Sequence, residues 1–157
     1  LLASVVALFF GTLPAAACPV ISAGVTEIYL SEADLGTSFG AEGTAGGDQN
    51  LANCGYAGGF VISRPDFSFH LSDVSGPMQV SVASPGCDTV LLVNAPDGSW
   101  WYDDDAGGDL QPWMQVDVAP GRMDVWVGTF NGDYCSATVL LNCSHPRPRA
   151  PVGRGHR

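Results

Sequence analysis

Short segments in which hydrophobic and polar residues alternate recur along the chain. Residues 67–72 alternate between Phe or Leu and Ser or His, and residues 78–83, 114–118 and 123–128 follow the same two-residue period. Successive side chains of a strand point to opposite faces, so each segment predicts a β-strand with one face in a core and the other in water. Helical periodicity is not visible anywhere in the chain.

The segment Thr89–Val93 reads TVLLV and is hydrophobic at nearly every position, which is typical of a central strand covered on both faces. A last strand is predicted over residues 135–142. The segments are closed by turn sequences, namely Ser75-Gly76-Pro77, Pro85-Gly86, Pro96-Asp97-Gly98, Ala106-Gly107-Gly108, Pro120-Gly121 and Asn131-Gly132. Strands spaced about ten residues apart with such turns predict an all-β fold, a jelly-roll-type antiparallel β-sandwich in a single domain.

The chain divides into four predicted segments. Residues 1–17 form a hydrophobic leader, and residues 18–53 contain an initial strand near 25–30 and a loose Gly-rich connection. Residues 54–143 form the core of the sandwich. Residues 144–157 are rich in Pro and Arg and too poor in hydrophobic side chains to fold, so this tail is predicted to be disordered.

The leader has the features of a secretory signal peptide. Its hydrophobic run ends in three alanines, Ala15 to Ala17, and is shorter than the roughly 20 residues of a membrane-spanning helix. It lacks an initial Met and a basic start, which indicates that the signal peptide is truncated. The leader predicts a secreted or periplasmic protein. Cys18 follows the alanines as in a bacterial lipoprotein, so a lipid anchor at Cys18 is the alternative, but Ala15 stands where Leu is usual.

Charge excludes one class of partner. The chain has 16 acidic residues, no Lys and six Arg, and four of these Arg lie in the tail. Between Cys18 and Cys143, only Arg64 and Arg122 are basic. Such a surface repels phosphate backbones, which argues against nucleic-acid binding by the folded part.

The cysteines of the core, Cys54, Cys87, Cys135 and Cys143, predict two disulfides in an exported protein. If Cys135 and Cys143 bracket one strand, their Cα atoms lie about 26 Å apart, too far for a bond. Two arrangements of the two bonds remain. We favour the arrangement that joins Cys54 to Cys143 and Cys87 to Cys135. A zinc site is disfavoured because no Cys-x-x-Cys pair occurs and His70 is the only histidine of the core.

One motif suggests an enzyme. Residues 36–40, Gly-Thr-Ser-Phe-Gly, match the G-x-S-x-G pattern in which Ser38 would be a hydrolase nucleophile and His70 its base. That nucleophile elbow requires a strand before the serine and a helix after it. The flanking residues predict neither, and no orienting acid is evident near His70, so we favour a chance match.

The segment Asp97–Asp109 concentrates carboxylates. Crowded carboxylates repel one another unless water or a hard cation relieves them, and Ca²⁺ takes oxygen ligands from flexible loops. The loop is not an EF-hand, because the position of the bidentate Glu, counted from Asp103, falls on Met114. Calcium is the candidate cofactor, and its candidate ligands are Asp88, Asp97, Asp103, Asp104, Asp105 and Asp109. The alternative is a solvated turn.

The same segment contains three consecutive aromatic residues, Trp100, Trp101 and Tyr102. If the two Trp lie on a strand, one faces inward and the other outward. An outward Trp beside Tyr102 would offer a flat surface on which a sugar ring stacks, and the alternative is packing against a neighbouring loop.

Residues 88–98 (DTVLLVNAPDG), 103–108 (DDDAGG) and 120–127 (PGRMDVWV) resemble, in order and spacing, the bacterial pre-peptidase C-terminal domain family. The resemblance covers about half of the chain. It implies a jelly-roll sandwich found in secreted proteins, often beside proteases, some members of which bind calcium or substrate matrices. Asp88, Asp103 and Asp104 match the acidic positions of the family, whereas Gln111 and Pro112 replace a further acid.

Together these observations predict an exported, non-catalytic binding or accessory module with an unknown protein or polysaccharide ligand. In one version of this hypothesis, calcium stabilises the module. Two alternatives stay open. One is a carbohydrate-binding module that uses Trp100, Trp101 and Tyr102, and the other is a small secreted serine hydrolase that uses Ser38 and His70.

Overall fold

The computed structural model describes residues 18–143. The predicted signal peptide at residues 1–17 and the predicted disordered tail at residues 144–157 lie outside this range.

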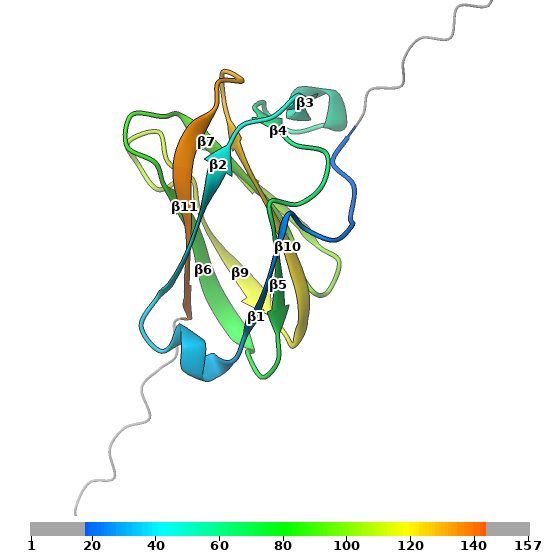
Figure 1. Ribbon diagram of the computed structural model, residues 1–157, viewed down its shortest axis with the longest axis vertical. Coiled ribbons are helices and arrows are strands. Elements are labelled where there is room, and N and C mark those ends of the chain that lie inside the picture. The colour runs from blue at the N-terminus through cyan, green and yellow to red at the C-terminus, as the bar shows by residue number, and fades with distance from the viewer. Residues whose placement is uncertain (1–17, 144–157) are drawn as a thin grey trace, which may run out of the picture.

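Two β-sheets pack face to face (Figure 1). Sheet A contains β1 (Thr26–Leu30), β5 (Phe67–Leu71), β10 (Gly121–Thr129), β7 (Thr89–Asn94) and β8 (Trp100–Asp103), and the short strands β4 (Phe60–Val61) and β3 (Gln49–Asn50) extend it beyond the end of β5. Sheet B contains, in spatial order, β2 (Phe39–Ala45), β11 (Cys135–Cys143), β6 (Gly76–Ala83) and β9 (Trp113–Val118). Two 3-10 turns, η1 (Glu32–Leu35) and η2 (Leu51–Cys54), complete the fold.

The predicted β-sandwich is confirmed, and each strand predicted from alternation between residues 67 and 142 is present. Strand β7 pairs with β10 on one side and β8 on the other, and all six of its residues are buried. Its hydrophobic side chains divide between the inside of the sandwich and the outer face of sheet A, which explains why TVLLV shows no alternation.

Two segments predicted as loops contain strands. The Gly-rich connection was expected to be loose, but residues 39–45 form β2, which pairs with β11 along seven residues. The acidic segment after Gly98 begins as β8, the edge strand beside β7. For β2, pairing with β11 supplies the stability that its Gly-rich sequence lacks, whereas the aromatic residues of β8 favour a strand by themselves.

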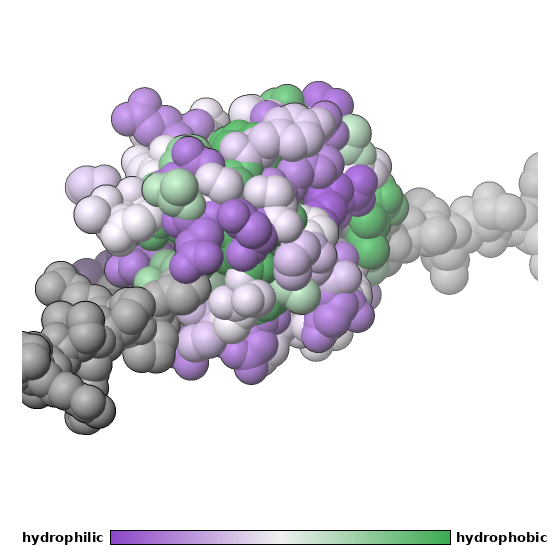
Figure 2. Space-filling model, turned by 90° about the horizontal axis from the view of Figure 1, so that it is seen from below, coloured by the Kyte–Doolittle hydropathy of each residue, from purple (hydrophilic) through white to green (hydrophobic). Residues whose placement is uncertain are grey.

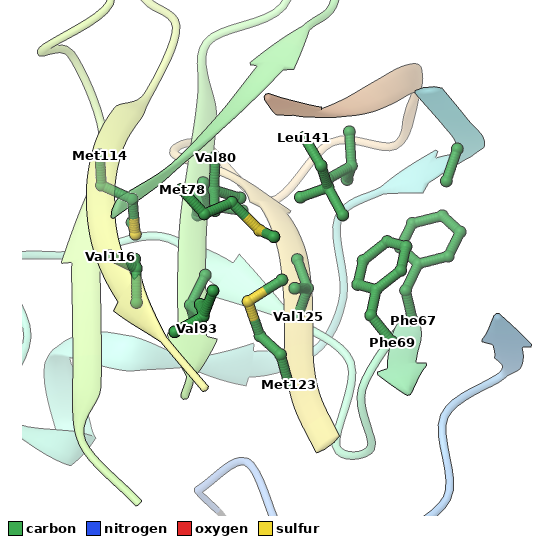
Figure 3. Packing of buried hydrophobic residues seen from close by; sticks show 14 of the residues in the cluster. Phe67, Phe69, Met78, Val80, Val93, Met114, Val116, Met123, Val125 and Leu141 are labelled. Atoms are coloured by element: carbon green, nitrogen blue, oxygen red, sulfur yellow. The ribbon is translucent and has the colours of Figure 1, made fainter. Parts of the chain in front are cut away.

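The main core fills the space between the sheets. Figure 3 shows side chains of sheet B, such as Met78 and Leu141, facing side chains of sheet A, such as Met123 and Phe69. All four are fully buried. Burial of such side chains contributes about 1.5–3 kcal/mol each to folding, so this interface between the sheets stabilises the fold.

A second, smaller core lies on the outer face of sheet A. Residues 46–62 cover Trp126, Leu92 and Val90 there, and contribute Leu51 and Val61. By contrast, the end of the molecule that bears η1 is mostly hydrophilic on the surface seen in Figure 2, with hydrophobic residues in small separate areas.

One of the two favoured disulfides is confirmed. Cys87 is bonded to Cys135, with Cα atoms 6.7 Å apart. The predicted bond between Cys54 and Cys143 is wrong, because Cys54 pairs with Cys18 instead and Cys143 is free. Figure 1 gives the reason: β3 and β4, which flank η2, lie at one end of the sandwich, and β11 ends at the other.

The pairing of Cys18 bears on the proposed lipid anchor. A lipid thioether and a disulfide would use the same sulfur atom, and the structure assigns this sulfur to the bond with Cys54. Two disulfides indicate folding in an oxidising, extracytoplasmic compartment. Within residues 18–143, no helix is long and apolar enough to cross a membrane.

Candidate binding surface

Ser38 and His70 do not form a catalytic pair. Ser38 is exposed just before β2, so a strand rather than a helix follows it. His70 lies on β5, in the other sheet, and no hydrogen bond joins it to Ser38 in the described part of the chain. The G-x-S-x-G sequence therefore does not form a nucleophile elbow here.

His70 packs against β1. Its ring stacks on Tyr29 with centroids 4.4 Å apart, and its Nε2 lies 3.9 Å from a carboxylate oxygen of Glu27. A hollow of about 550 Å³ lies beside it, next to Arg122. Nε2 is buried and neither donates nor accepts a hydrogen bond, so this nitrogen is closed to a substrate in the hollow.

A buried acid lies one row along the sheet from His70, where sequence reasoning found none. Asp124 of β10 accepts hydrogen bonds from the Ser68 hydroxyl at 2.5 Å and from Arg122 at 2.7 and 3.0 Å. The backbone N–H of Gly24 donates to the Ser68 hydroxyl in turn. These bonds use both carboxylate oxygens of Asp124, so the group holds β10, β5 and the segment before β1 together. In the sequence, Asp124 was visible as an acid between Met123 and Val125, on the outward side of a predicted strand.

Two of the predicted calcium ligands bond to their own loop. Asp97 accepts from the backbone N–H and hydroxyl of Ser99, and these bonds lower the pKa of Asp97. Asp103 accepts from the backbone N–H groups of Ala106 and Trp113 at 3.0 and 2.9 Å. The two carboxylates therefore shape the turn and tie the loop to β9.

The other candidate ligands do not form a preformed cation site. Burial raises the pKa of Asp88, and the neighbouring carboxylates of Asp105 and Asp104 raise it further. Asp109 is exposed, with a left-handed φ of 52°. Among residues 18–143, no three or more His, Cys, Asp or Glu side chains are grouped so that they could hold a metal ion. Calcium binding stays a prediction.

The predicted sugar platform is only partly occupied by protein packing, since Trp100 and Trp101 are each 39% exposed. Trp100 lies against buried Trp126, with ring centroids 5.3 Å apart. Tyr102 stacks on Tyr56 and donates its hydroxyl to a backbone carbonyl, and burial, with the nearby carboxylates, raises its pKa to about 12. Trp101 donates its indole N–H to Ser99.

Sequence reasoning missed Trp113, which lies at the edge of the outer face of sheet B and is 38% exposed. We define this face as the outward side of β9, β6, β11 and β2. Its outward residues include Trp113, Gln115, Gln79, Ser81, Ala83, Thr138, Leu140, Asn142, Gly40 and Glu42. Adjacent positions are in register, since Trp113 pairs with Ser81 and Ser81 with Leu140. The signal was visible in the alternation of residues 113–118, where Trp occupies an outward position.

Two hollows lie side by side on this face. One of about 450 Å³ is lined by Trp113, Ser81 and the loop at Asp109, and one of about 310 Å³ is lined by Thr138 and Glu42. Ala83 and Pro85 line both hollows, so the two hollows are neighbours, and together we call them the track.

The amide side chains of this face make no hydrogen bonds within the described protein. Within residues 18–143, no hydrogen bond engages the side-chain amides of Gln79, Gln115 or Asn142, which are exposed or half-buried. The charged side chains described on this face are Glu42 and Asp117, and both lie on edge strands. Its centre therefore offers donors and acceptors without charge.

Comparisons with known proteins place the similarity at the level of the fold. No family model matches the sequence, and no curated protein matches it. The pre-peptidase C-terminal domain of collagenase from Bacillus anthracis is similar in structure, with a TM-score of 0.47, 10% identity, and coverage of 74% of this chain and 95% of that one. It is a domain of the kind that the sequence resembles. PliG of Aeromonas hydrophila, a periplasmic lysozyme inhibitor of g-type lysozyme, gives a TM-score of 0.45, 13% identity, and coverage of 77% and 98%.

Proposed function

We propose that this protein is an exported, non-catalytic binding module that holds its ligand on the outer face of sheet B. The observation that carries the proposal is the track of two neighbouring hollows on this face, beside a row of amide side chains that make no hydrogen bonds within the described protein. The face is built on four paired strands, and a surface on rigid elements binds without a large ordering cost.

Adsorption to insoluble extracytoplasmic materials tests this proposal. Purified protein is sedimented with cellulose, chitin, peptidoglycan sacculi and collagen fibrils, and compared with Ala83→Arg. Ala83 is exposed and lines both hollows, so an arginine there would fill the track. Ala57→Arg is the matched control, since Ala57 is also exposed but lies in the segment that covers sheet A.

We expect the wild type and Ala57→Arg to bind at least one material and Ala83→Arg to lose binding, with thermal unfolding of all three unchanged. Adsorption to none of the materials, or equal adsorption of Ala83→Arg, would contradict the proposed surface. Covalent labelling of Ser38 by a fluorophosphonate probe, abolished in Ser38→Ala, would contradict the non-catalytic assignment.

Calcium stabilisation of the acidic loop is a separate proposal. The mutual repulsion of Asp88, Asp104 and Asp105 supports it, since a cation would relieve that repulsion. Thermal unfolding is measured in calcium and in excess chelator. A ligand at about a hundredfold excess over its Kd stabilises the native state by about 2.7 kcal/mol, which shifts the midpoint by several degrees. A shift that is lost in Asp104→Asn supports a calcium site, and an unchanged midpoint leaves the loop as a solvated turn.

A further inference from the structure

The outer face of sheet B carries chemical features that select among ligand classes. The face combines one exposed indole ring, primary amides and hydroxyl groups, and it lacks a basic side chain in the described residues. We infer that the ligand is an uncharged polysaccharide strand that crosses sheet B, with one sugar ring stacked on Trp113. This inference rests on the proposed binding function and adds to it a ligand class and a central residue.

Trp113 is held in place by the acidic loop. Its backbone N–H donates to Asp103 at 2.9 Å, and the same carboxylate fixes the turn at Ala106. Gly107 packs so close to this strand that a Cβ on it would lie 3.2 Å from the Cβ of Trp113 and 2.8 Å from the carbonyl oxygen of Gln111. The ring therefore stands on a backbone that is already ordered, and binding would cost little conformational entropy.

An indole ring and a sugar ring are complementary. The C–H groups on one face of a pyranose are apolar and slightly positive, and the face of an aromatic ring is apolar and negative. Trp113 is 38% exposed and lines the larger hollow, so its ring borders the space that a sugar would fill. Trp100, although 39% exposed, already packs at a tilt against Trp126, and Tyr102 stacks on Tyr56.

The amides suit sugar hydroxyl groups. Each primary amide offers two donors and an acceptor, and each sugar hydroxyl both donates and accepts. Gln115 and Gln79 lie opposite each other on β9 and β6, and Asn142 lies opposite Gln79 on β11. These three side chains form one row across the sheet. The neighbouring row contains Trp113, Ser81 and Leu140. The amide row lines neither hollow, so it would contact a strand of several sugar units from beside the track.

The charge of this face argues against polyanions as ligands, and its composition argues against a protein partner. A protein of net charge −10 without a cation on this face repels polyanions such as nucleic acids and acidic glycans. Centres of protein–protein interfaces are enriched in aromatic residues, Met and Arg. The described outward side chains of this face include one aromatic residue and no Met or Arg, which favours a neutral glycan over a protein partner.

The test uses titration with soluble hexasaccharides of cellulose, xylan, chitin and β-1,3-glucan, followed by intrinsic fluorescence and by calorimetry. We expect at least one of them to bind. Trp113→Ala should weaken it about tenfold or more, Trp113→Phe should retain part of the affinity, and Trp101→Ala should bind as the wild type does. Trp101 is the matched control because it is similarly exposed, at 39%, but lies on sheet A.

Gln79→Ala and Gln115→Ala keep the proposal testable if Trp113→Ala does not fold, because these side chains make no bonds within the described protein. Each should weaken binding without changing the unfolding midpoint. Absence of binding by every neutral hexasaccharide would overturn the inference, as would binding that depends on Trp101 and not on Trp113, or tighter binding of polygalacturonate.

The two proposals fail in different ways. If Ala83→Arg abolishes adsorption to collagen while no neutral glycan binds, the binding face stands and the polysaccharide ligand is wrong. If a glycan binds but Ala83→Arg and Trp113→Ala both leave its affinity unchanged, the binding face itself is wrong.

Discussion

Asp66 is a carboxyl group whose burial affects stability. Its side chain accepts a hydrogen bond from the backbone N–H of Val127 at 2.8 Å, and it fills a gap in the pairing of β10 between β5 and β4. Burial raises the pKa of Asp66 from 3.8 to about 7, and the bond from Val127 opposes only part of this shift. Folding thus favours the protonated form of this residue.

We predict that Asp66 makes the protein less stable as pH rises. Between pH 3.8 and about 7 the native state binds more protons at this residue than the unfolded state does, so its contribution to unfolding free energy falls across that window. The loss is a few kcal/mol in order of magnitude. Asp66→Asn keeps an acceptor for Val127 without the charge, and should therefore be more stable than wild type at pH 8 and similar at pH 4.

Urea denaturation at both pH values measures this effect. Asp117→Asn, at an exposed position of β9, is the control and should change stability little at either pH. Equal effects of the two substitutions at pH 8 would contradict the role assigned to Asp66.

Gln111 explains one departure from the resembled family. Its side-chain N–H groups donate to the carbonyl oxygens of Cys87 at 2.6 Å and Leu110 at 3.0 Å. Its amide oxygen lies 3.2 Å from the hydroxyl of Thr89, which donates to it. A carboxylate at this position could accept but not donate, so the amide ties two loops together where an acid could not.

We predict that Gln111→Glu destabilises the protein by about 2 kcal/mol, because it removes the donors and places a negative charge against carbonyl oxygens. Gln115→Glu is the matched control, since the side chain of Gln115 is exposed on the outer face of sheet B. Thermal and urea unfolding compare the two. A loss for Gln111→Glu no larger than for the control would show that the amide does not bridge these loops.

At the scale of elements, glycine allows the cover of sheet A to approach the sheet. A Cβ on Gly47 would lie 1.9 Å from the backbone carbonyl carbon of Val61, in β4. Gly128 of β10 is similarly close to Phe60, at 2.3 Å from its carbonyl oxygen. Residues 46–62 reach Trp126 and Leu92 only because the chain is this narrow at these contacts.

We predict that Gly47→Ala destabilises the protein by about 3 kcal/mol or more, since backbone must move to admit the methyl group. Gly36→Ala is the control, because Gly36 has an ordinary helical φ of −60° and a Cβ there would have a normal contact at 3.4 Å. It should change stability by less than about 0.5 kcal/mol. Chemical denaturation measures both, and similar values for the two variants would contradict the close contact.

At the scale of the whole molecule, the disulfide between Cys87 and Cys135 links the sheets. Cys87 precedes β7 of sheet A, and Cys135 begins β11 of sheet B. The bond closes a sequence separation of 48 residues, so it restricts the unfolded chain considerably. The bond from Cys18 to Cys54 instead fastens the start of the described chain to η2.

We predict that the double substitution Cys87→Ser, Cys135→Ser lowers the unfolding free energy by about 2–5 kcal/mol. Cys143→Ser is the control and should have a smaller effect, because Cys143 is half-buried and free. Peptide mapping should find the pairs Cys18–Cys54 and Cys87–Cys135. A peptide that joins Cys54 to Cys143 would contradict the structure.

The sequence alone determined the fold class and the core strands. The two-residue alternation in residues 67–71, 78–82 and 114–118 predicts them, because each such strand has one face in the core, and that requirement is local. The turns are predicted by Gly, Pro and Asn, because the backbone conformations that these residues favour are also a local property. Excluding a bond across one strand left two disulfide arrangements open, and the sequence did not decide between them.

Only the tertiary structure decided which side chains share a surface. Strand β2 was missed because Gly-rich sequence has little strand propensity, and its pairing with β11 is a contact between residues almost a hundred positions apart in the chain. The outer face of sheet B is likewise assembled from four strands, so no segment of sequence could reveal that Trp113, Gln79 and Asn142 share a surface. The local pattern sets which side of a strand faces water, and the register between distant strands sets which side chains meet there.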